Sequence, residues 1–252
     1  MEKVILTIDN GLATVTINNV KTHNALAVDV LEGLIQAFTQ IDKDSSVIVA
    51  ILTGAGDKAF AAGADLSTFM TTTPEDAIEM SKLGQAACNS IAYCSVPVIA
   101  AINGVAYGGG MEVALACDIR IASENAKFGQ QEANWGIIPA WGGTQRLQMV
   151  VGQSDAMRII LTAEPFDAQE AYRMSLVSAV YPQAELMDRS YEMAKKIVAI
   201  GGAHIRYAKK AMAQGANYVT KAGLALENEL IAHCFRLGTP KKRVEKFLAK
   251  KK

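Results

Sequence analysis

One glycine-rich segment, residues 103–118, constrains the fold of this chain more than any other. It reads NGVAYGGGMEVALACD, so three consecutive glycines lead into an apolar run that carries Glu112. The preceding residues, 98–102, are apolar and largely β-branched, which is typical of a buried strand. The pattern predicts a strand, a glycine loop and a helix. The loop would let a ligand approach the backbone closely, and the start of the helix favours negative charge.

Gly109 and Glu112 are three residues apart, so in a helix they lie near one another on one face of the first turn. A backbone donor for a developing oxyanion would then lie beside a candidate general base, which suggests chemistry at a carbonyl. The dinucleotide fingerprint G-x-G-x-x-G/A is not met, because Val113 occupies the place of its third glycine. A structural role for the glycines, in packing the strand against the helix, remains the alternative.

The segments around this one alternate strand, loop and helix, which is the pattern of an α/β fold with a parallel sheet covered by helices. Asn10-Gly11 between alternating residues 4–8 and 12–17 predicts a hairpin. Residues 128–144 are rich in turn formers and read as irregular. We expect strands over 47–52, 119–122 and 177–181, and helices over 28–41, 74–93, 153–162, 167–174, 184–199, 203–214, 220–237 and 241–249.

Composition excludes several classes of function. The 252 residues carry 25 basic and 25 acidic side chains, which argues against a dominant role in binding nucleic acid or anionic membranes. Four cysteines without C-x-x-C spacing predict reduced thiols, and no metal-ligand cluster is expected. Without an apolar leader after Met1, or an apolar run of about 18 residues, we expect a cytoplasmic protein.

A second loop, residues 59–66, also follows a strand and precedes a predicted helix. Both loops would lie at the carboxyl ends of their strands, where ligands bind in open α/β sheets. Together they could offer two backbone N–H groups to one oxygen, as an oxyanion hole requires. For the Asp65 side chain we favour a helix N-cap.

Glu132 is a second candidate carboxylate, in a turn-rich segment between Phe128 and Trp135. Apolar neighbours favour the protonated form of a carboxyl group, which suits a general acid. The alternative is a solvent-facing loop glutamate. No G-x-S-x-G motif occurs, and the three histidines are isolated, so nucleophilic catalysis is not supported. The basic stretches at 241–243 and 250–252 read as a solvated helix face and tail.

In combination these motifs resemble the crotonase (enoyl-CoA hydratase/isomerase) family over essentially the whole chain. The resemblance implies the crotonase (ClpP-like) fold of repeated ββα units, with a core over 1–200 that holds an acyl-CoA site. It implies a helical region over 201–252 for trimerisation and for closing the site. The segments that carry it are AAGAD (61–65), PVIAAING (97–104), GGGME (108–112), CD (117–118), FGQ (128–130) and GGTQRL (142–147).

The resemblance also assigns roles to residues. Glu112 and Glu132 correspond to the two hydratase glutamates, and the backbone N–H groups of Ala64 and Gly109 to the oxyanion hole. The remaining substrate-binding positions are Lys58, Ala61, Ala62, Asp65, Leu66, Ser67, Trp141 and Lys250. Trp135 and Trp141 are bulky for their places, so an indole lining the acyl pocket would make it short. Ile231 stands where some hydratases have an aromatic residue.

The expected activity is that of a hydro-lyase of fatty acid metabolism. It would hydrate short trans-2-enoyl-CoA thioesters reversibly to 3-hydroxyacyl-CoA, with no cofactor beyond the coenzyme A of the substrate. Which glutamate is acid and which is base stays open. We expect a homotrimer or a hexamer built as a dimer of trimers. The alternatives are an enoyl-CoA isomerase, which needs a single base, and a non-catalytic acyl-CoA-binding or RNA-binding scaffold.

Overall fold

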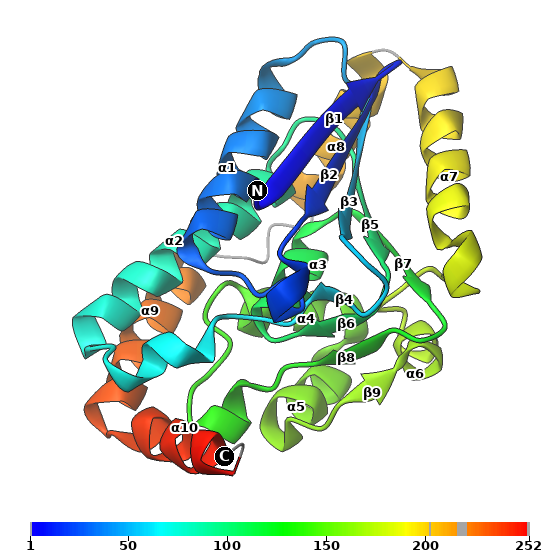
Figure 1. The fold of residues 1–252 in the computed structure, drawn as a ribbon. Coiled ribbons are helices and arrows are strands. Elements are labelled where there is room, and N and C mark those ends of the chain that lie inside the picture. The colour runs from blue at the N-terminus through cyan, green and yellow to red at the C-terminus, as the bar shows by residue number, and fades with distance from the viewer. Residues whose placement is uncertain (1, 202, 216–220, 251–252) are drawn as a thin grey trace.

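The computed structural model describes residues 2–201, 203–215 and 221–250, and its first part is built from successive β-β-α units (Figure 1). This arrangement confirms the repeated ββα pattern implied by the crotonase resemblance. The Asn10-Gly11 turn has positive φ at both residues, as a tight hairpin requires. The units are β1 (Val4–Asp9), β2 (Leu12–Ile17) and α1 (Val28–Lys43); β3 (Val49–Gly54), β4 (Ala59–Ala61) and α2 (Pro74–Ala92); β5 (Val98–Ile102), β6 (Val105–Tyr107) and α3 (Gly109–Ala116); and β7 (Ile119–Ser123), β8 (Lys127–Gly129) and α4 (Gly143–Val151).

The strands form two sheets rather than the single sheet expected from sequence. The larger has the order β1-β2-β3-β5-β7-β10 and is parallel except for the β1–β2 hairpin. The smaller has the order β4-β6-β8-β9 and consists of strands of two or three residues. Strands this short are too brief to show alternating polar and apolar residues, so these residues were predicted to lie in loops. That prediction was wrong. The second sheet brings the ligand-facing loops together.

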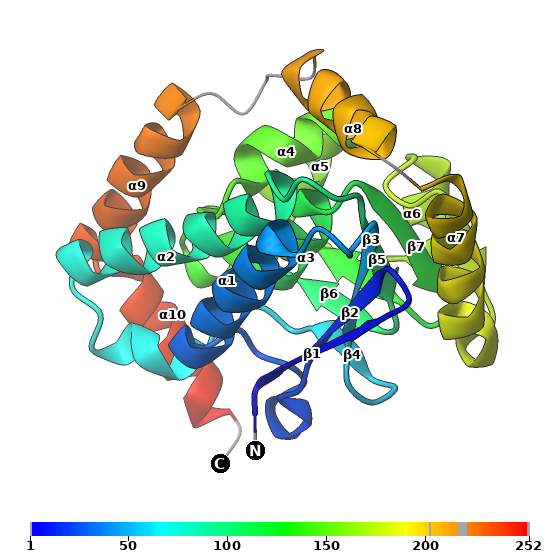
Figure 2. The ribbon, with the colours of Figure 1, turned by 90° about the horizontal axis from the view of Figure 1, so that it is seen from above.

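Helices cover both faces of the larger sheet (Figures 1 and 2). Every residue of β3 is buried, with Ala50 and Leu52 facing one hydrophobic cluster and Val49 and Ile51 the other. The first cluster includes α1, α2 and α3, and the second is closed by α7. A strand buried on both faces is the behaviour expected of a parallel sheet. The elements that carry the site described below are therefore anchored in a buried hydrophobic core.

The C-terminal part of the chain is mostly helical, as the sequence predicted. Helix α9 packs along α2, and α10 packs against the short helices η2 (Leu66–Met70) and η3 (Glu132–Trp135). Residue 220, predicted to begin a helix, and the terminal residues 251–252 lie outside the described residues. In the described part of the chain no helix is long and apolar enough to cross a membrane. The remaining elements are α5 (Gln153–Thr162), β9 (Phe166–Asp167), α6 (Ala168–Arg173), β10 (Ala179–Tyr181), η4 (Gln183–Glu185), α7 (Leu186–Ile200), α8 (Ala203–Gly215), α9 (Lys221–Arg236) and α10 (Thr239–Ala249).

Candidate active site

Helix α3 begins at Gly109, directly after the third strand pair, and its first turn faces a pocket. Gly108 precedes it with φ 50° and ψ −122°, a backbone conformation that side-chain-bearing residues rarely adopt. Gly109 is the first helical residue, so its N–H has no partner within the helix. Glu112 follows within the same turn. The predicted placement of Gly109 beside Glu112 is therefore what the structure shows.

The loop that carries Ala64 meets the start of α3. Leu26 forms a parallel bridge with Ala64 and donates its N–H to the Gly63 carbonyl at 2.8 Å, which fixes the loop. A Cβ at Gly63 would stand 3.7 Å from the Gly109 nitrogen. Ala64 and Gly109 line the same pocket. Two small-residue loops therefore converge there, as a pair of backbone donors to one oxygen would require.

Glu112 is a buried carboxylate, with 2% of its surface exposed. Its Oε1 accepts hydrogen bonds from the backbone N–H of Trp141 at 2.8 Å and of Gly143 at 2.7 Å. Backbone donors to a carboxylate oxygen favour the ionised form and fix the orientation of the group. A Cβ at position 143 would stand 2.8 Å from this same oxygen and 2.9 Å from Pro139 Cβ, so a larger residue there would displace the carboxylate or the turn.

Side chains from α2 and α4 hold the turn that supplies these donors. The Ala140 carbonyl accepts hydrogen bonds from Ser81 Oγ at 2.7 Å and from Gln85 Nε2 at 3.0 Å. Arg146 donates from Nη1 to the Trp141 carbonyl at 2.9 Å and from Nη2 to Asn89 Oδ1 at 2.7 Å. With its carbonyls anchored in this way, the turn aims its N–H groups at Glu112.

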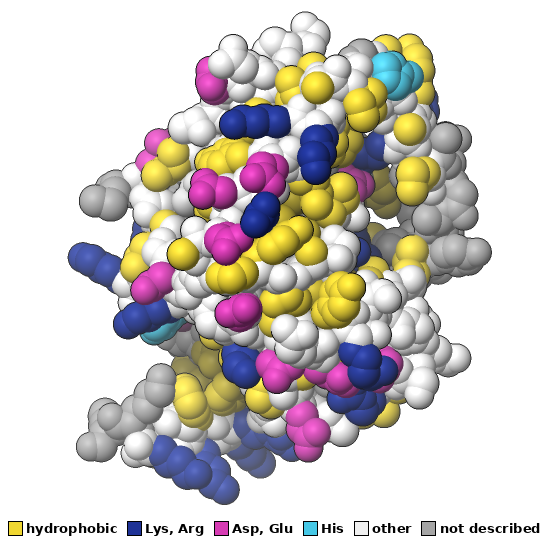
Figure 3. Space-filling model, turned by 90° about the vertical axis from the view of Figure 1, so that its right-hand side faces the viewer, with side chains coloured by type: hydrophobic (Ala, Val, Ile, Leu, Met, Phe, Trp, Pro, Cys, Tyr) yellow, Lys and Arg dark blue, Asp and Glu magenta, His cyan; other side chains and the backbone are white. Residues whose placement is uncertain are grey.

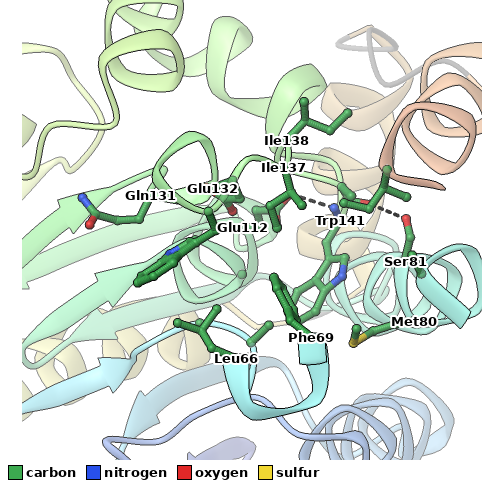
Figure 4. Close-up of a pocket in the computed structure, with 18 of the residues that line it drawn as sticks. Leu66, Phe69, Met80, Ser81, Glu112, Gln131, Glu132, Ile137, Ile138 and Trp141 are labelled. Atoms are coloured by element: carbon green, nitrogen blue, oxygen red, sulfur yellow. Dashed lines mark hydrogen bonds between the residues drawn. The ribbon is translucent and has the colours of Figure 1, made fainter. Parts of the chain in front are cut away.

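Glu132 lies in η3 and is only 7% exposed, so the alternative of a solvent-facing loop glutamate is wrong. A Cβ at Gly108 would stand 3.0 Å from Glu132 Oε1, which places this carboxylate against the start of α3. Glu112 and Glu132 line the same pocket (Figure 4). Two carboxylates from separate β-β-α units therefore meet beside Gly108 and Gly109.

The pocket has a volume of about 180 Å³ and is lined mainly by apolar side chains. This is below the roughly 300–1,000 Å³ of pockets that hold drug-sized ligands. Both Trp135 and Trp141 line it. The Trp141 indole lies between Gly84 of α2 and Gly109, and a Cβ at either glycine would overlap its ring. A large side chain thus fills space that a longer ligand would need.

The C-terminal helices complete the pocket wall. Ile231 and Phe235 of α9 line it, and Phe235 packs edge-on against Phe69 of η2 with ring centroids 5.4 Å apart. Phe247 of α10 packs edge-on against Trp135 at 4.8 Å. Phe69, Met80, Ser81 and Phe235 also line the pocket but were not predicted to do so. Residues at helical spacing have the same pattern whether they face a core or a pocket, so no signal distinguished these four.

The structure does not bring every predicted substrate residue to the pocket. Ala62 and Leu66 line it, whereas Ala61 is buried in β4. Asp65 caps η2 by accepting the Ser67 N–H at 2.9 Å, which confirms the predicted N-cap. Lys58 lies in a separate hollow with Lys21 and His23. Lys250 is exposed at the end of α10.

Burial favours the neutral form of two further side chains, Tyr107 and Cys117. Burial raises the pKa of the Tyr107 phenol, which lines the pocket. Burial also raises the pKa of the Cys117 thiol at the end of α3. Cys88, Cys94, Cys117 and Cys234 are free thiols. Among the described residues, no group of three or more His, Cys, Asp or Glu is placed to hold a metal ion.

Gly110 is a position where the site's geometry can be tested through stability. A Cβ at Gly110 would overlap the Ala61 carbonyl, which belongs to the backbone of β4 and cannot rotate away. We expect Gly110→Ala to lower the free energy of unfolding by about 1–3 kcal/mol or more, measured by urea denaturation. A change smaller than about 0.5 kcal/mol, typical of a surface substitution, would contradict this packing of α3 on β4.

Comparison with known proteins agrees with this geometry. The model of the family "Enoyl-CoA hydratase/isomerase" matches residues 7–252. The chain is 40% identical to a short-chain-enoyl-CoA hydratase of Clostridium acetobutylicum, over 100% of this chain and 97% of that protein. It is 39% identical to a crotonyl-CoA hydratase of Syntrophomonas wolfei, over 100% of this chain and 96% of that protein.

Solved structures agree as well. An enoyl-CoA hydratase from Bacillus anthracis superimposes with a TM-score of 0.82 at 36% identity, covering 99% of this chain and 96% of that one. An enoyl-CoA hydratase from Bacillus halodurans superimposes with a TM-score of 0.90 at 27% identity, covering 97% of this chain and 99% of that one. The fold is the crotonase fold. The chain belongs to the enoyl-CoA hydratase/isomerase family.

Proposed function

We propose that this protein is an enoyl-CoA hydratase, which converts short trans-2-enoyl-CoA thioesters reversibly to 3-hydroxyacyl-CoA. The observation that carries this is the pair of buried carboxylates, Glu112 and Glu132, in one small apolar pocket beside the converging Ala64 and Gly109 loops. The relatives named as short-chain-enoyl-CoA and crotonyl-CoA hydratases, each about 40% identical over the full chain, support the same activity and a crotonyl-sized substrate.

The groups at the site divide the reaction between them. The N–H groups of Ala64 and Gly109 hydrogen-bond the thioester oxygen and stabilise the negative charge that develops on it; one such donor is worth about 2.7–4 kcal/mol. Glu112 removes a proton from water, whose hydroxyl adds to Cβ. Glu132 delivers a proton to Cα. The product contains all the atoms of one water molecule, so no redox partner is needed.

Further substrate contacts are part of the same proposal. Lys58, Ala61, Asp65, Ser67 and Lys250 would contact the coenzyme A portion, which must extend out of a pocket too small to enclose it. Lys250 would reach the coenzyme's phosphate, from its own or a neighbouring subunit. The chains would assemble into a homotrimer or a hexamer through the helical region 201–252.

Two other functions fit the site less well. A double-bond isomerase needs a single base, whereas both carboxylates here are buried in the pocket. An RNA-binding scaffold would present a strongly basic surface, whereas acidic and basic side chains are interspersed over most of the face in Figure 3, with Lys and Arg gathered only at its lower edge. The substrate comparison that separates hydratase from isomerase uses crotonyl-CoA and a 3-enoyl-CoA. The hydratase assignment predicts 3-hydroxybutyryl-CoA from the first and little conversion of the second, and the reverse preference would favour the isomerase.

A further inference from the structure

Arg243 of the C-terminal helix α10 contacts a segment of the active site that is distant in the chain. The basic stretch at 241–243 was expected to form a solvated helix face, and the Arg243 side chain is exposed. Its Nη1 nevertheless donates to the Ala133 carbonyl at 2.9 Å and to the Asn134 carbonyl at 3.1 Å. Both carbonyls belong to the short helix η3. Because the last carbonyls of a helix lack partners within it, Arg243 satisfies them from outside.

Helices α10 and η3 also meet through aromatic rings. Phe247, one turn further along α10, packs edge-on against Trp135 at the end of η3, with ring centroids 4.8 Å apart. A second support for η3 comes from the end of α5. There the Ala163 carbonyl accepts hydrogen bonds from Gln131 Nε2 at 2.9 Å and from Asn134 Nδ2 at 3.3 Å. The position of η3 is therefore set by contacts with α10 and with α5.

Helix η3 carries two residues of the pocket, Glu132 at its start and Trp135 at its end. Glu132 is the proposed proton donor to Cα, and Trp135 is part of the pocket wall. They belong to one short helix, so a shift of η3 moves both. A misplacement of about 1 Å can lower the rate of an enzyme roughly 10²-fold, so the contacts that fix η3 bear on turnover.

We propose that Arg243 is a positioning residue, which fixes η3 against α10 and thereby places both Glu132 and the Trp135 wall. The inference rests on the proposed hydratase function for its kinetic consequences only. Without the guanidinium, η3 keeps its support at the Ala163 carbonyl and its ring contact with Phe247. The expected result is therefore a partial loss of activity, together with a looser pocket wall.

Two exposed neighbours on α10 provide the test and its control. Arg243→Met removes the donor to η3, and Lys242→Met removes one positive charge from the same turn. Arg243→Met should lower kcat/KM for crotonyl-CoA about three- to tenfold, the range expected for one hydrogen bond. Because the Trp135 wall is loosened, the ratio of kcat/KM for the ten-carbon to the four-carbon substrate should rise about threefold, roughly the equivalent of one buried methylene.

Lys242→Met should behave like the wild type. Arg243→Lys keeps a cationic donor at the same place and should restore part of the activity. Equal losses on the four-carbon and ten-carbon substrates in Arg243→Met would indicate only a general structural effect and would overturn the proposal.

A second measurement needs no turnover, so it separates failure of this inference from failure of the proposed function. The sequence has two tryptophans, so Trp135 is the only one in a Trp141→Phe background. In that background Arg243→Met should shift the Trp135 emission to longer wavelength and increase its quenching by acrylamide, because the indole becomes more exposed to water as η3 moves from Phe247. Lys242→Met should change neither property.

Unchanged Trp135 emission and quenching in Arg243→Met would overturn the proposal, even in a protein that hydrates crotonyl-CoA. An equal change in Lys242→Met would overturn it as well, since the effect would then belong to the charge of α10. If the fluorescence changes only in Arg243→Met but the wild type does not hydrate crotonyl-CoA, the hold of Arg243 on η3 stands and the hydratase function is rejected.

Discussion

Replacing Glu132 by glutamine should lower kcat for crotonyl-CoA hydration by about 10²–10⁴-fold. The substitution keeps the size of the side chain and its place in η3, but a neutral amide cannot exchange a proton with Cα. Because the proposed oxyanion donors are backbone groups in other segments, binding of a coenzyme A thioester should persist. Steady-state kinetics and calorimetric binding of a saturated acyl-CoA measure the two effects separately.

Matched variants sharpen the test of the two carboxylates. Glu112→Gln should cause a loss of similar size, since water activation needs that base. Glu164→Gln changes an exposed glutamate and should leave turnover unaffected. Turnover near the wild-type value in Glu132→Gln would reject the assigned role. Loss of thioester binding along with activity would instead indicate a damaged pocket.

Trp141→Ala should shift the preference of the enzyme towards longer acyl chains. The indole fills the space between Gly84 and Gly109 inside a pocket of about 180 Å³, so removing it opens room beyond a four-carbon chain. Each buried methylene contributes about 0.8 kcal/mol, so the ratio of kcat/KM for the ten-carbon to the four-carbon substrate should rise by at least about tenfold. Kinetics across an enoyl-CoA chain-length series measures this ratio.

The control for this change is Trp141→Phe, which keeps an aromatic wall and should leave the ratio close to that of the wild type. Loss of a buried Trp side chain also costs about 3–5 kcal/mol of stability, so the series should be run below the melting transition of the variant. Faster turnover of the ten-carbon substrate by the wild type would refute a short pocket. An unchanged ratio in Trp141→Ala would show that another side chain limits the chain length.

The part of the site that lies within one short segment could be predicted from the sequence. Gly109 and Glu112 are three residues apart, so their proximity in one helical turn follows from their spacing alone. Glu132 was harder to place, because its burial depends on packing against Gly108, a contact between segments distant in the chain. The family resemblance supplied its role, and the structure supplied its burial.

Other parts of the fold and the site could not be predicted from local pattern. Strands β4, β6 and β8 have three residues each, too few to show a period, yet their sheet aligns the loops. Gly84 of α2 leaves the space that the Trp141 indole fills, because a Cβ there would overlap the ring. The sequence gives no sign of this contact between α2 and residue 141. Lys58 and Lys250 lie outside the pocket, so their contacts depend on where the coenzyme extends. Their roles remain predictions.

The central claim is that two buried carboxylates add water to a short enoyl thioester. The most direct test mixes crotonyl-CoA with the wild type and with the double variant Glu112→Gln/Glu132→Gln, follows the ultraviolet absorbance of the enoyl thioester, and identifies the product by mass. The wild type should lose the absorbance and form 3-hydroxybutyryl-CoA, while the double variant should leave the substrate unchanged. No loss of absorbance with the wild type at high enzyme concentration, or equal product from both proteins, would contradict it.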